Sequence, residues 1–446
     1  MTHLATLFRA QRRWLLLFVS TAVLAWLGHI HFATAQRAAA LPDSTDFYKF
    51  FLSAQRVNNG QSMYWLVPPR AHPGDPCHPS STAADRQHLD TQVPSGLLLG
   101  GDDPCLGPNL NPPIFTALTL PLTHLPYEQA WWAWSAASIA AGILGVVLLV
   151  CALATDTRQR TVGCLAGCAA LFLCYPTLAN ASLGQVGTLL LPPLVLAWRA
   201  LRRRDELWGG VWLGLVAGFK PFLLILLPAL WVQQRRRACM AAAATVAGMG
   251  LLGWALFGSD MHRHYLLVAA DVTWSGTNWN ASWAGVIERI LSGQADSVLP
   301  QGSALARAWA SGLSLLTVAL VCWRLRQARH SPREDADALM ALGLPASLLA
   351  SPLGWSYYFP MLALPWILLW RHSAQMPTPR PWRMGLLLPL TLSAPTIAIQ
   401  ASPRPETPSV WWGVDSIYFY ALVCLLGLGI ALLQMKPERR NEQGAP

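Results

Sequence analysis

The chain has 446 residues, of which 53% are hydrophobic and only 12% are charged. Soluble proteins usually carry about 25% charged residues, so this composition excludes an ordinary soluble domain and predicts a polytopic membrane protein. The net charge of +10 is better explained by the topology of the loops than by nucleic-acid binding, and we expect no nucleic-acid partner.

The N-terminal segment predicts a first membrane span rather than a cleaved signal peptide. Arg9, Arg12 and Arg13 precede an apolar run of about 20 residues, which is the length of a spanning helix. Basic residues before a span favour the cytoplasmic side. We therefore expect the chain to begin in the cytoplasm and to retain this segment.

Apolar windows predict an all-α fold of about twelve spanning helices in one membrane domain, residues 1–446, with both termini in the cytoplasm. The predicted spans are residues 14–34, 131–153, 162–178, 187–201, 207–219, 221–233, 238–257, 304–323, 336–350, 357–371, 384–400 and 414–434. Several are shorter than a bilayer crossing, which is tolerable where protein surrounds them. Most of the 32 basic residues then lie in cytoplasmic connections, as the positive-inside rule requires.

Two long polar segments, residues 35–130 and 258–303, face away from the cytoplasm in this topology. The apolar run 114–122 in the first segment is too short to span, and two prolines precede it. It therefore predicts an interfacial or re-entrant helix. Cys77 and Cys105 lie in the same segment, and a disulfide between them is left open by the sequence.

The stretch after the first span predicts a short helix with an acid at its start. Its apolar positions share one helical face; they are Phe47, Phe50, Phe51, Ala54 and Val57. Ser44 and Thr45 are candidate caps at the start, and Asn58, Asn59 and Gly60 supply a left-handed stop at the end. Asp46 lies at the mouth of this helix, where a carboxylate either caps the backbone or accepts a proton from a substrate hydroxyl.

A polar turn with the sequence Gly184-Gln185-Val186-Gly187 is predicted between the third and fourth spans, on the non-cytoplasmic side. Gln185 offers an amide donor and acceptor at this depth, and Asn180 precedes it. A glycine-flanked polar turn is more often only a turn, so both interpretations stay open.

Lys220 is the most informative charge in the predicted bundle. It lies midway between two cytoplasmic arginine runs, 202–204 and 235–237, and precedes Pro221. Only a hairpin of two short helices returns the chain to the same side within that interval, so Lys220 belongs at the non-cytoplasmic turn. Such a cation either snorkels to the interface or serves as the counter-charge of a bound phosphate.

Two further groups lie in predicted non-cytoplasmic turns. Tyr357 and Tyr358 follow a Ser-Pro-Leu-Gly turn and can orient a sugar or phosphate, or form part of an aromatic belt. His262, Arg263 and His264 can add positive charge to the site, although a cluster of this size in a loop is usually solvated surface.

No nucleotide-binding or metal-binding motif of useful quality occurs in the sequence. A site for a soluble nucleotide sugar is therefore disfavoured, and any sugar donor should be carried by a lipid and met within the membrane.

Six stretches, taken in order, resemble the membrane mannosyltransferases of glycosyltransferase family 87, within the GT-C superfamily. They are DFYKFF with a following GQSMY, NPPIFTALTLPLTHLP, GQVGTLLL, GLVAGFKPFLLILLPAL, NWNASWAGVIERIL and SPLGWSYYFPMLALP. Each stretch is degenerate alone, but all six in register are fairly specific. The family's later Ser-Pro motif often ends in histidines, and their places hold Tyr357 and Tyr358 here.

The resemblance implies an inverting transfer of a hexose, mannose or a related sugar, from a polyprenyl-phosphate donor to a lipid or glycan acceptor. The reaction is expected on the extracytoplasmic face of the bacterial cytoplasmic (inner) membrane. Asp46 matches the family's acidic residue and would be the general base, while Lys220 would lie near the donor phosphate. We expect Lys49, Asn109 and Asn111 to face the acceptor.

The chemistry of such a transfer agrees with these residue types. Displacing a lipid phosphate needs a base on one face of the sugar and charge stabilisation of the leaving oxyanion on the other. A carboxylate beside an apolar face should have a raised pKa, which would make Asp46 a stronger base. Lysine, arginine and amide donors can stabilise a monophosphate, so we expect no cofactor and no obligatory metal.

Two other functions remain as alternatives. A lipid-linked sugar flippase or transporter would place ionisable groups near the bilayer midplane, often in two related halves. Here the polar candidates concentrate at outer turns, and the halves show no symmetry. A catalytically degenerate scaffold for envelope assembly is the second alternative, and the replacement of the family's histidines by Tyr357 and Tyr358 keeps it open.

Overall fold

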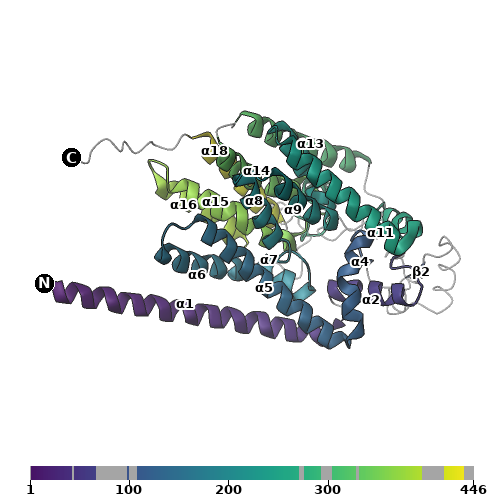
Figure 1. The fold of residues 1–446 in the computed structure, drawn as a ribbon, viewed down its shortest axis with the longest axis horizontal. Coiled ribbons are helices and arrows are strands. Elements are labelled where there is room, and N and C mark those ends of the chain that lie inside the picture. The colour runs from purple at the N-terminus through teal and green to yellow at the C-terminus, as the bar shows by residue number, and fades with distance from the viewer. Residues whose placement is uncertain are drawn as a thin grey trace.

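The computed structural model is a bundle of helices (Figure 1). It describes residues 2–42, 45–66, 98–99, 108–270, 276–292, 304–327, 331–393 and 416–435. Cys77 and Cys105 lie outside the described residues, so a disulfide between them stays a prediction.

Over the residues that the structure describes, which exclude residues 394–400 and 414–415 of the last two spans, each predicted span overlaps one helix or two consecutive helices. These are α1 (Thr2–Ala39), α5 (Tyr127–Leu153), α6 (Thr157–Leu173), α7 (Tyr175–Leu183), α8 (Leu191–Arg202), α9 (Glu206–Phe219), η3 (Pro221–Ile225), α10 (Leu226–Val232), α11 (Arg236–Ala270), α13 (Ala304–Gln327), α14 (Pro332–Ala350), η4 (Ser356–Leu362), α15 (Ala363–Ser373), α16 (Pro379–Leu392) and α18 (Ile417–Gln434). The shorter elements between them are α2 (Asp46–Asn58), α4 (Pro113–Thr119), η2 (Leu120–His124) and α12 (Trp283–Ser292).

Five of the described helices are long and apolar enough to cross a membrane, namely α1 from Phe18 onward, α5, α11, α13 and α18. A sixth span results if α6 and α7, which are bent by 67° at their junction, form one broken crossing. The outer helices keep large apolar side chains exposed, such as Trp254 on α11 and Leu315 on α13, which suits contact with lipid. The chain is a multi-pass membrane protein, while the count of twelve spans and the cytoplasmic termini stay predictions.

Strands contribute little to the described part of the chain. β1 (Trp65–Leu66) pairs in parallel with β2 (Leu98–Leu99), and an isolated antiparallel bridge joins Asn280 to Trp355. The predicted all-α class is therefore confirmed for the residues that the structure describes.

The bundle has its core around α8 and α14, and its short elements gather at one end. Leu191, Leu194 and Trp198 of α8 are fully buried, as is most of α14. α2 and α4 lie at the end opposite to the N-terminal end of α1 (Figure 1). α4 and η2 occupy the run that the sequence predicts as an interfacial or re-entrant helix.

Small residues bring α9 and α11 into close contact. A Cβ atom added at Gly210 would overlap the carbonyl oxygen of Ala238, and one added at Gly214 would overlap that of Ala242. Glycines spaced four residues apart let two helix backbones approach closely in this way. The contact fixes the position of α9 and, at its end, of Lys220.

We predict that Gly214→Leu lowers the free energy of unfolding by about 1–3 kcal/mol or more, because the side chain has no space between the two backbones. Gly250→Leu is the matched control, since nothing lies within 4 Å of a Cβ atom added at Gly250. Thermal unfolding of the two purified variants in detergent measures the difference. Equal melting temperatures would show that α9 and α11 are not packed as described.

Candidate active site

α2 forms because its apolar face is buried and its first turn is capped. Phe47, Phe50 and Phe51 are at most 3% exposed, as the spacing predicts. The side chain of Thr45 accepts a hydrogen bond from the Tyr48 amide at 3.1 Å, which confirms Thr45 as the N-cap. Since Thr45 occupies this role, the Asp46 carboxylate is not the cap and is available for other contacts. The helix ends before Gly60, whose φ of 72° confirms the predicted left-handed stop.

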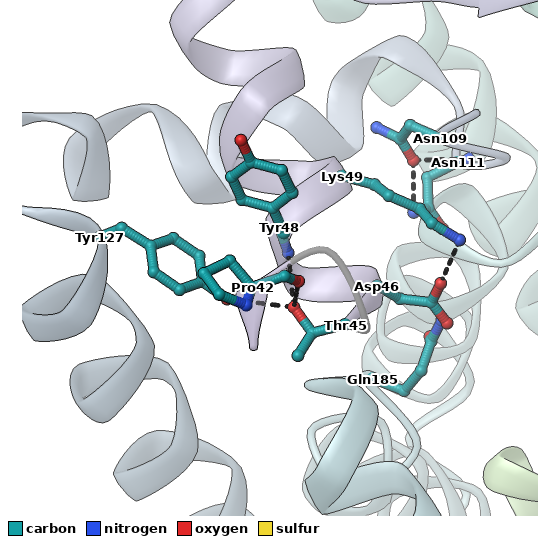
Figure 2. A network of polar contacts seen from close by, with 9 residues as sticks. All are labelled: Pro42, Thr45, Asp46, Tyr48, Lys49, Asn109, Asn111, Tyr127 and Gln185. Atoms are coloured by element: carbon teal, nitrogen blue, oxygen red, sulfur yellow. Dashed lines mark hydrogen bonds and ion pairs between the residues drawn. The ribbon is translucent and has the colours of Figure 1, made fainter. Parts of the chain in front are cut away.

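The Asp46 carboxylate is held by one cation and one amide. Lys49 Nζ lies 2.6 Å from Oδ1, and Gln185 Nε2 donates to Oδ2 at 2.7 Å. Figure 2 shows the two side chains reaching the carboxylate from different directions, Lys49 from the next turn of α2 and Gln185 from the chain after α7. The Asp46 side chain keeps 17% of its surface exposed, so it is enclosed but not sealed.

The electrostatics of Asp46 correct one expectation. Burial acts to raise the pKa of the Asp46 carboxyl, but the Lys49 charge and hydrogen bond, the Gln185 hydrogen bond and the Lys220 charge together outweigh it. The pKa of Asp46 therefore lies below its ordinary value, and the prediction of a raised pKa is wrong. The apolar face of α2 is real, but the carboxylate turns away from it toward donors.

Gln185 is positioned by a tightly packed turn. α7 ends at Gly184, whose φ is 65°, and a Cβ atom there would overlap Phe47 and Trp131. Trp134 Nε1 donates to the Gly184 carbonyl at 2.7 Å. The turn is thus fixed against both α2 and α5, which accounts for the short bond between Gln185 and Asp46.

The side chain of Asn180 stabilises this turn through two hydrogen bonds. Its Oδ1 accepts from the Gly187 amide at 2.6 Å, and its Nδ2 donates to Thr188 Oγ1 at 3.2 Å. Asn180 is 1% exposed. In this structure its polar atoms hold the turn together, and the contact with Asp46 comes from Gln185.

Lys220 lies at the tip of a hairpin of short helices, α9 followed by η3 and α10, as the sequence predicts. It is 5% exposed, and its Nζ donates to Asn111 Oδ1 at 2.5 Å and to the Tyr358 hydroxyl at 2.7 Å. The amine also lies 4.8 Å from the Tyr358 ring centroid and 5.5 Å from that of Phe115. Burial lowers the pKa of Lys220 to about 7, although the negative charge of Asp46 opposes the shift.

Asn109 and Asn111, which the sequence assigns to the acceptor, contact Lys220 or support that contact. Asn111 Nδ2 donates to Asn109 Oδ1 at 2.7 Å, which directs Asn111 Oδ1 toward Lys220. Asn109 Nδ2 in turn donates to Ser53 Oγ at 3.3 Å. The pair therefore links α2 to the lysine hairpin.

The two tyrosines come from a part of the chain that is distant in sequence from Asp46 and Lys220. Tyr357 and Tyr358 lie at the start of η4, with ring centroids 4.9 Å apart in an edge-on arrangement. Both interact electrostatically with Asp46, and Tyr358 contacts Lys220 directly. The preceding turn is anchored by Asn280, whose Oδ1 accepts from the Gly354 amide at 2.9 Å.

The histidine cluster lies apart from these groups. Residues 259–270 continue α11 as helix after a break at Gly258, where φ is 80° and ψ is 172°, so the segment is not the coil that its sequence suggests. His262 Nδ1 contacts the Gly258 carbonyl oxygen at 3.1 Å, and Arg263 is exposed. His264 reaches Ser62 Oγ at 2.9 Å. None of the contacts described for these three residues is to Asp46 or Lys220.

Sequence reasoning missed two members of the site. Phe115 presents its ring to Lys220, and the Tyr64 hydroxyl donates to the Asn111 carbonyl at 2.6 Å. Both belong to stretches singled out in the sequence, NPPIF and GQSMY, but neither motif indicates which side chain points inward. The arrangement as a whole brings the Asp46 carboxylate and the buried Lys220 amine close enough to interact electrostatically, and each has its own amide or hydroxyl partner.

Comparison with known proteins assigns the chain to a family. The sequence model of "Glycosyltransferase family 87" matches residues 109–352, a range that includes Asn111, Gln185 and Lys220 but not Asp46. A curated relative from Mycolicibacterium smegmatis (strain ATCC 700084 / mc(2)155) is 28% identical over 336 residues, covering 71% of this chain and 75% of the relative. That relative is a "Polyprenol-phosphate-mannose-dependent alpha-(1-2)-phosphatidylinositol pentamannoside mannosyltransferase". No solved structure matches the chain. The family match covers more than half of the sequence, and the chain therefore belongs to glycosyltransferase family 87 and is a glycosyltransferase.

Proposed function

We propose that this enzyme transfers mannose, or a related hexose, from a polyprenyl-phosphate donor to a lipid or glycan acceptor, with inversion at the anomeric carbon. The observation that carries the proposal is the placement of two groups of opposite charge, the enclosed Asp46 carboxylate and the buried Lys220 amine, which interact electrostatically. Both are tied to α2: Asp46 is its first residue, and Lys220 is linked through Asn111 and Asn109 to Ser53 of the same helix. The relative from Mycolicibacterium smegmatis is named as a polyprenol-phosphate-mannose-dependent enzyme that acts on a phosphatidylinositol pentamannoside, which supports the choice of donor and of a glycolipid acceptor.

In this proposal Asp46 is the general base on the acceptor hydroxyl. The hydroxyl proton moves to the carboxylate as the acceptor oxygen forms a bond to the anomeric carbon. At the same time the bond between that carbon and the phosphate oxygen breaks, and its electron pair stays on the phosphate. Attack from the side opposite to the leaving group inverts the configuration, which requires the base and the phosphate site to lie on different faces of the sugar.

Lys49 occupies the position that the acceptor must enter. Its amine is bound to Asp46 Oδ1 and is 23% exposed, so it can exchange its contact for a substrate hydroxyl. We assign Lys49 to the acceptor side of the site, with Asn109 and Asn111 between it and Lys220. Because an ion pair with Lys49 weakens Asp46 as a base, its displacement by the acceptor strengthens the base when it is needed.

Lys220, Tyr357 and Tyr358 form the donor side of the site. A lysine ammonium and a tyrosine hydroxyl can both donate to phosphate oxygens, and the aromatic rings can contact the sugar. Gln185, held by Asn180, contacts the sugar between the two sides. Arg263, between His262 and His264, is exposed and adds positive charge that attracts an anionic lipid.

We further propose that the reaction occurs on the extracytoplasmic face of the bacterial cytoplasmic membrane. The supporting observation is that most basic residues of the chain lie in the connections at the opposite end of the predicted spans, and such a bias marks the cytoplasmic side. The chain would then cross the membrane about twelve times, with both termini inside.

The first prediction concerns the base. Asp46→Asn should lower kcat by at least about 10²-fold, because the amide cannot accept the proton, while the variant still folds and inserts. Asp156→Asn is the matched control: Asp156 caps α6 through the Gln159 amide, and asparagine caps a helix equally well. Release of polyprenyl phosphate from a purified donor measures the rate. Full activity of Asp46→Asn would refute the assignment, and sugar transport without any release of polyprenyl phosphate would point to a transporter.

The second prediction concerns the pH dependence contributed by Lys220. Since burial lowers the pKa of Lys220 to about 7, the ammonium is present below that pH and is lost above it. We expect kcat/KM for the donor to fall as the pH rises through about 7. Lys220→Ala should raise the donor KM and remove this pH dependence. An unchanged donor KM in Lys220→Ala would show that Lys220 only holds Asn111 and Tyr358 in place and does not bind the donor.

The third prediction concerns Lys49. Its charge is the largest effect that lowers the pKa of Asp46, so Lys49→Ala should raise the pKa of the Asp46 carboxyl. Because Asp46 must be ionised to act, the acid limb of the kcat/KM profile should move to higher pH. An acid limb at the same pH in both proteins would show that the titrating group is not Asp46.

A further inference from the structure

The amide of Gln185 has only one orientation compatible with its neighbour. Asp46 is ionised, so its oxygens can only accept hydrogen bonds. Gln185 must therefore present Nε2 to Asp46, as it does at 2.7 Å, and its Oε1 must point elsewhere. Turning the amide over would place two acceptors against each other.

The remaining oxygen of this amide has no hydrogen-bond partner among the residues that the structure describes. Gln185 is 4% exposed, and its Oε1 is fully buried without a hydrogen-bond donor. The nearest cations are already engaged, Lys49 with Asp46 and Lys220 with Asn111 and Tyr358. Leaving a buried acceptor unpaired costs about 1–3 kcal/mol, so an unpaired oxygen beside the reacting carboxylate indicates a donor that arrives with the substrate.

We propose that Gln185 Oε1 accepts a hydrogen bond from a sugar ring hydroxyl adjacent to the reacting position, so that one amide both orients Asp46 and selects the substrate. This inference rests on the proposed function. A hydroxyl has a single proton, so the hydroxyl that Asp46 deprotonates cannot also donate to Gln185. The group required is a second hydroxyl on a neighbouring carbon, which sugars carry and simple alcohols lack.

Such a hydroxyl can belong to the acceptor ring or to the transferred hexose, and both have the same chemistry. A site that hydrogen-bonds a hydroxyl rejects the analogue without it much more strongly than an apolar site does, because the buried acceptor is then left unpaired. Selectivity for one hydroxyl that disappears together with Gln185 is therefore the signature of the contact.

The experiment is a double-mutant cycle between Gln185 and the substrate hydroxyls. The full-length enzyme, Gln185→Met and the control Gln233→Met are assayed with polyprenyl-phosphate mannose and an alkyl mannoside acceptor, then with a monodeoxy series of each. Gln233 is a close match: its Nε2 donates to the Asp335 carbonyl at 2.8 Å, its Oε1 is also buried and unpaired, and it is 6% exposed. It lies at the other end of α10 from the Lys220 turn.

We expect one monodeoxy compound to lower kcat/KM by about 10- to 100-fold in the wild type and in Gln233→Met, and to have little effect in Gln185→Met. A deoxy acceptor with this behaviour places the contact on the acceptor, and a deoxy donor places it on the transferred hexose. Equal losses in wild type and Gln185→Met for every compound would overturn the proposal, because Gln185 would then act only by positioning Asp46.

A substitute variant and a separate failure criterion distinguish failure of this inference from failure of the proposed function. If Gln185→Met does not fold, Gln185→Asn replaces it, since the shorter amide withdraws the oxygen and should lose the same selectivity. If the wild type transfers no sugar from any polyprenyl-phosphate donor, the proposed function itself fails. Transfer with additive losses overturns only the role of Gln185 Oε1.

Discussion

A lysine enclosed by protein keeps its charge only if an anion and hydrogen-bond acceptors lie within reach. Lys220 has one full acceptor in Asn111 Oδ1, a hydroxyl from Tyr358, two aromatic faces and the field of Asp46. The Asp46 carboxylate is enclosed in the same way, and its negative charge is stabilised by Lys49 and Gln185. Each charge is thus compensated by contacts that a substrate could replace, which is a more useful arrangement for catalysis than a direct ion pair between the two.

The elements that carry these groups are turns and short helices, and long helices supply the frame. The end of α7, the tip of the α9 hairpin and the start of η4 each deliver a side chain to the same site from distant parts of the sequence. Their positions depend on close backbone contacts, such as Gly184 against Phe47 and Trp131. A loop alone would not hold Gln185 at bonding distance from Asp46, because conformational freedom would disperse it.

Local patterns in the sequence predict the helices and turns of the site but not which side chains contact one another. The apolar face of α2, its Thr45 cap and the proline-marked hairpin at Lys220 are all short-range features, and the structure confirms them. The pKa of Asp46 was mispredicted because Gln185 is 139 positions away along the chain, and because Lys49 was assigned to the acceptor without counting its charge. Asn111 is expected at the acceptor, whereas its contact with Lys220 spans 109 positions of the chain, a separation at which no local pattern can indicate a partner. The predicted span ends at residue 257, whereas α11 bends at Gly258 and continues as a helix to Ala270.

The charges of the site also bear on the proposed chemistry. Asp46, Lys49 and Lys220 together carry one net positive charge when the lysines are protonated, and a polyprenyl-phosphate hexose is a phosphodiester with one negative charge. After transfer Asp46 is neutral and holds the acceptor proton, so the site carries two positive charges. The released lipid phosphate is a monoester, which carries a charge of about −1.5 to −2 at neutral pH. The sum stays near zero on both sides of the reaction, so little charge has to be stabilised by solvent in an enclosed site. A variant that removes either lysine lowers the charge of the site by one both before and after transfer, and therefore leaves the donor and the product phosphate each with one cation too few.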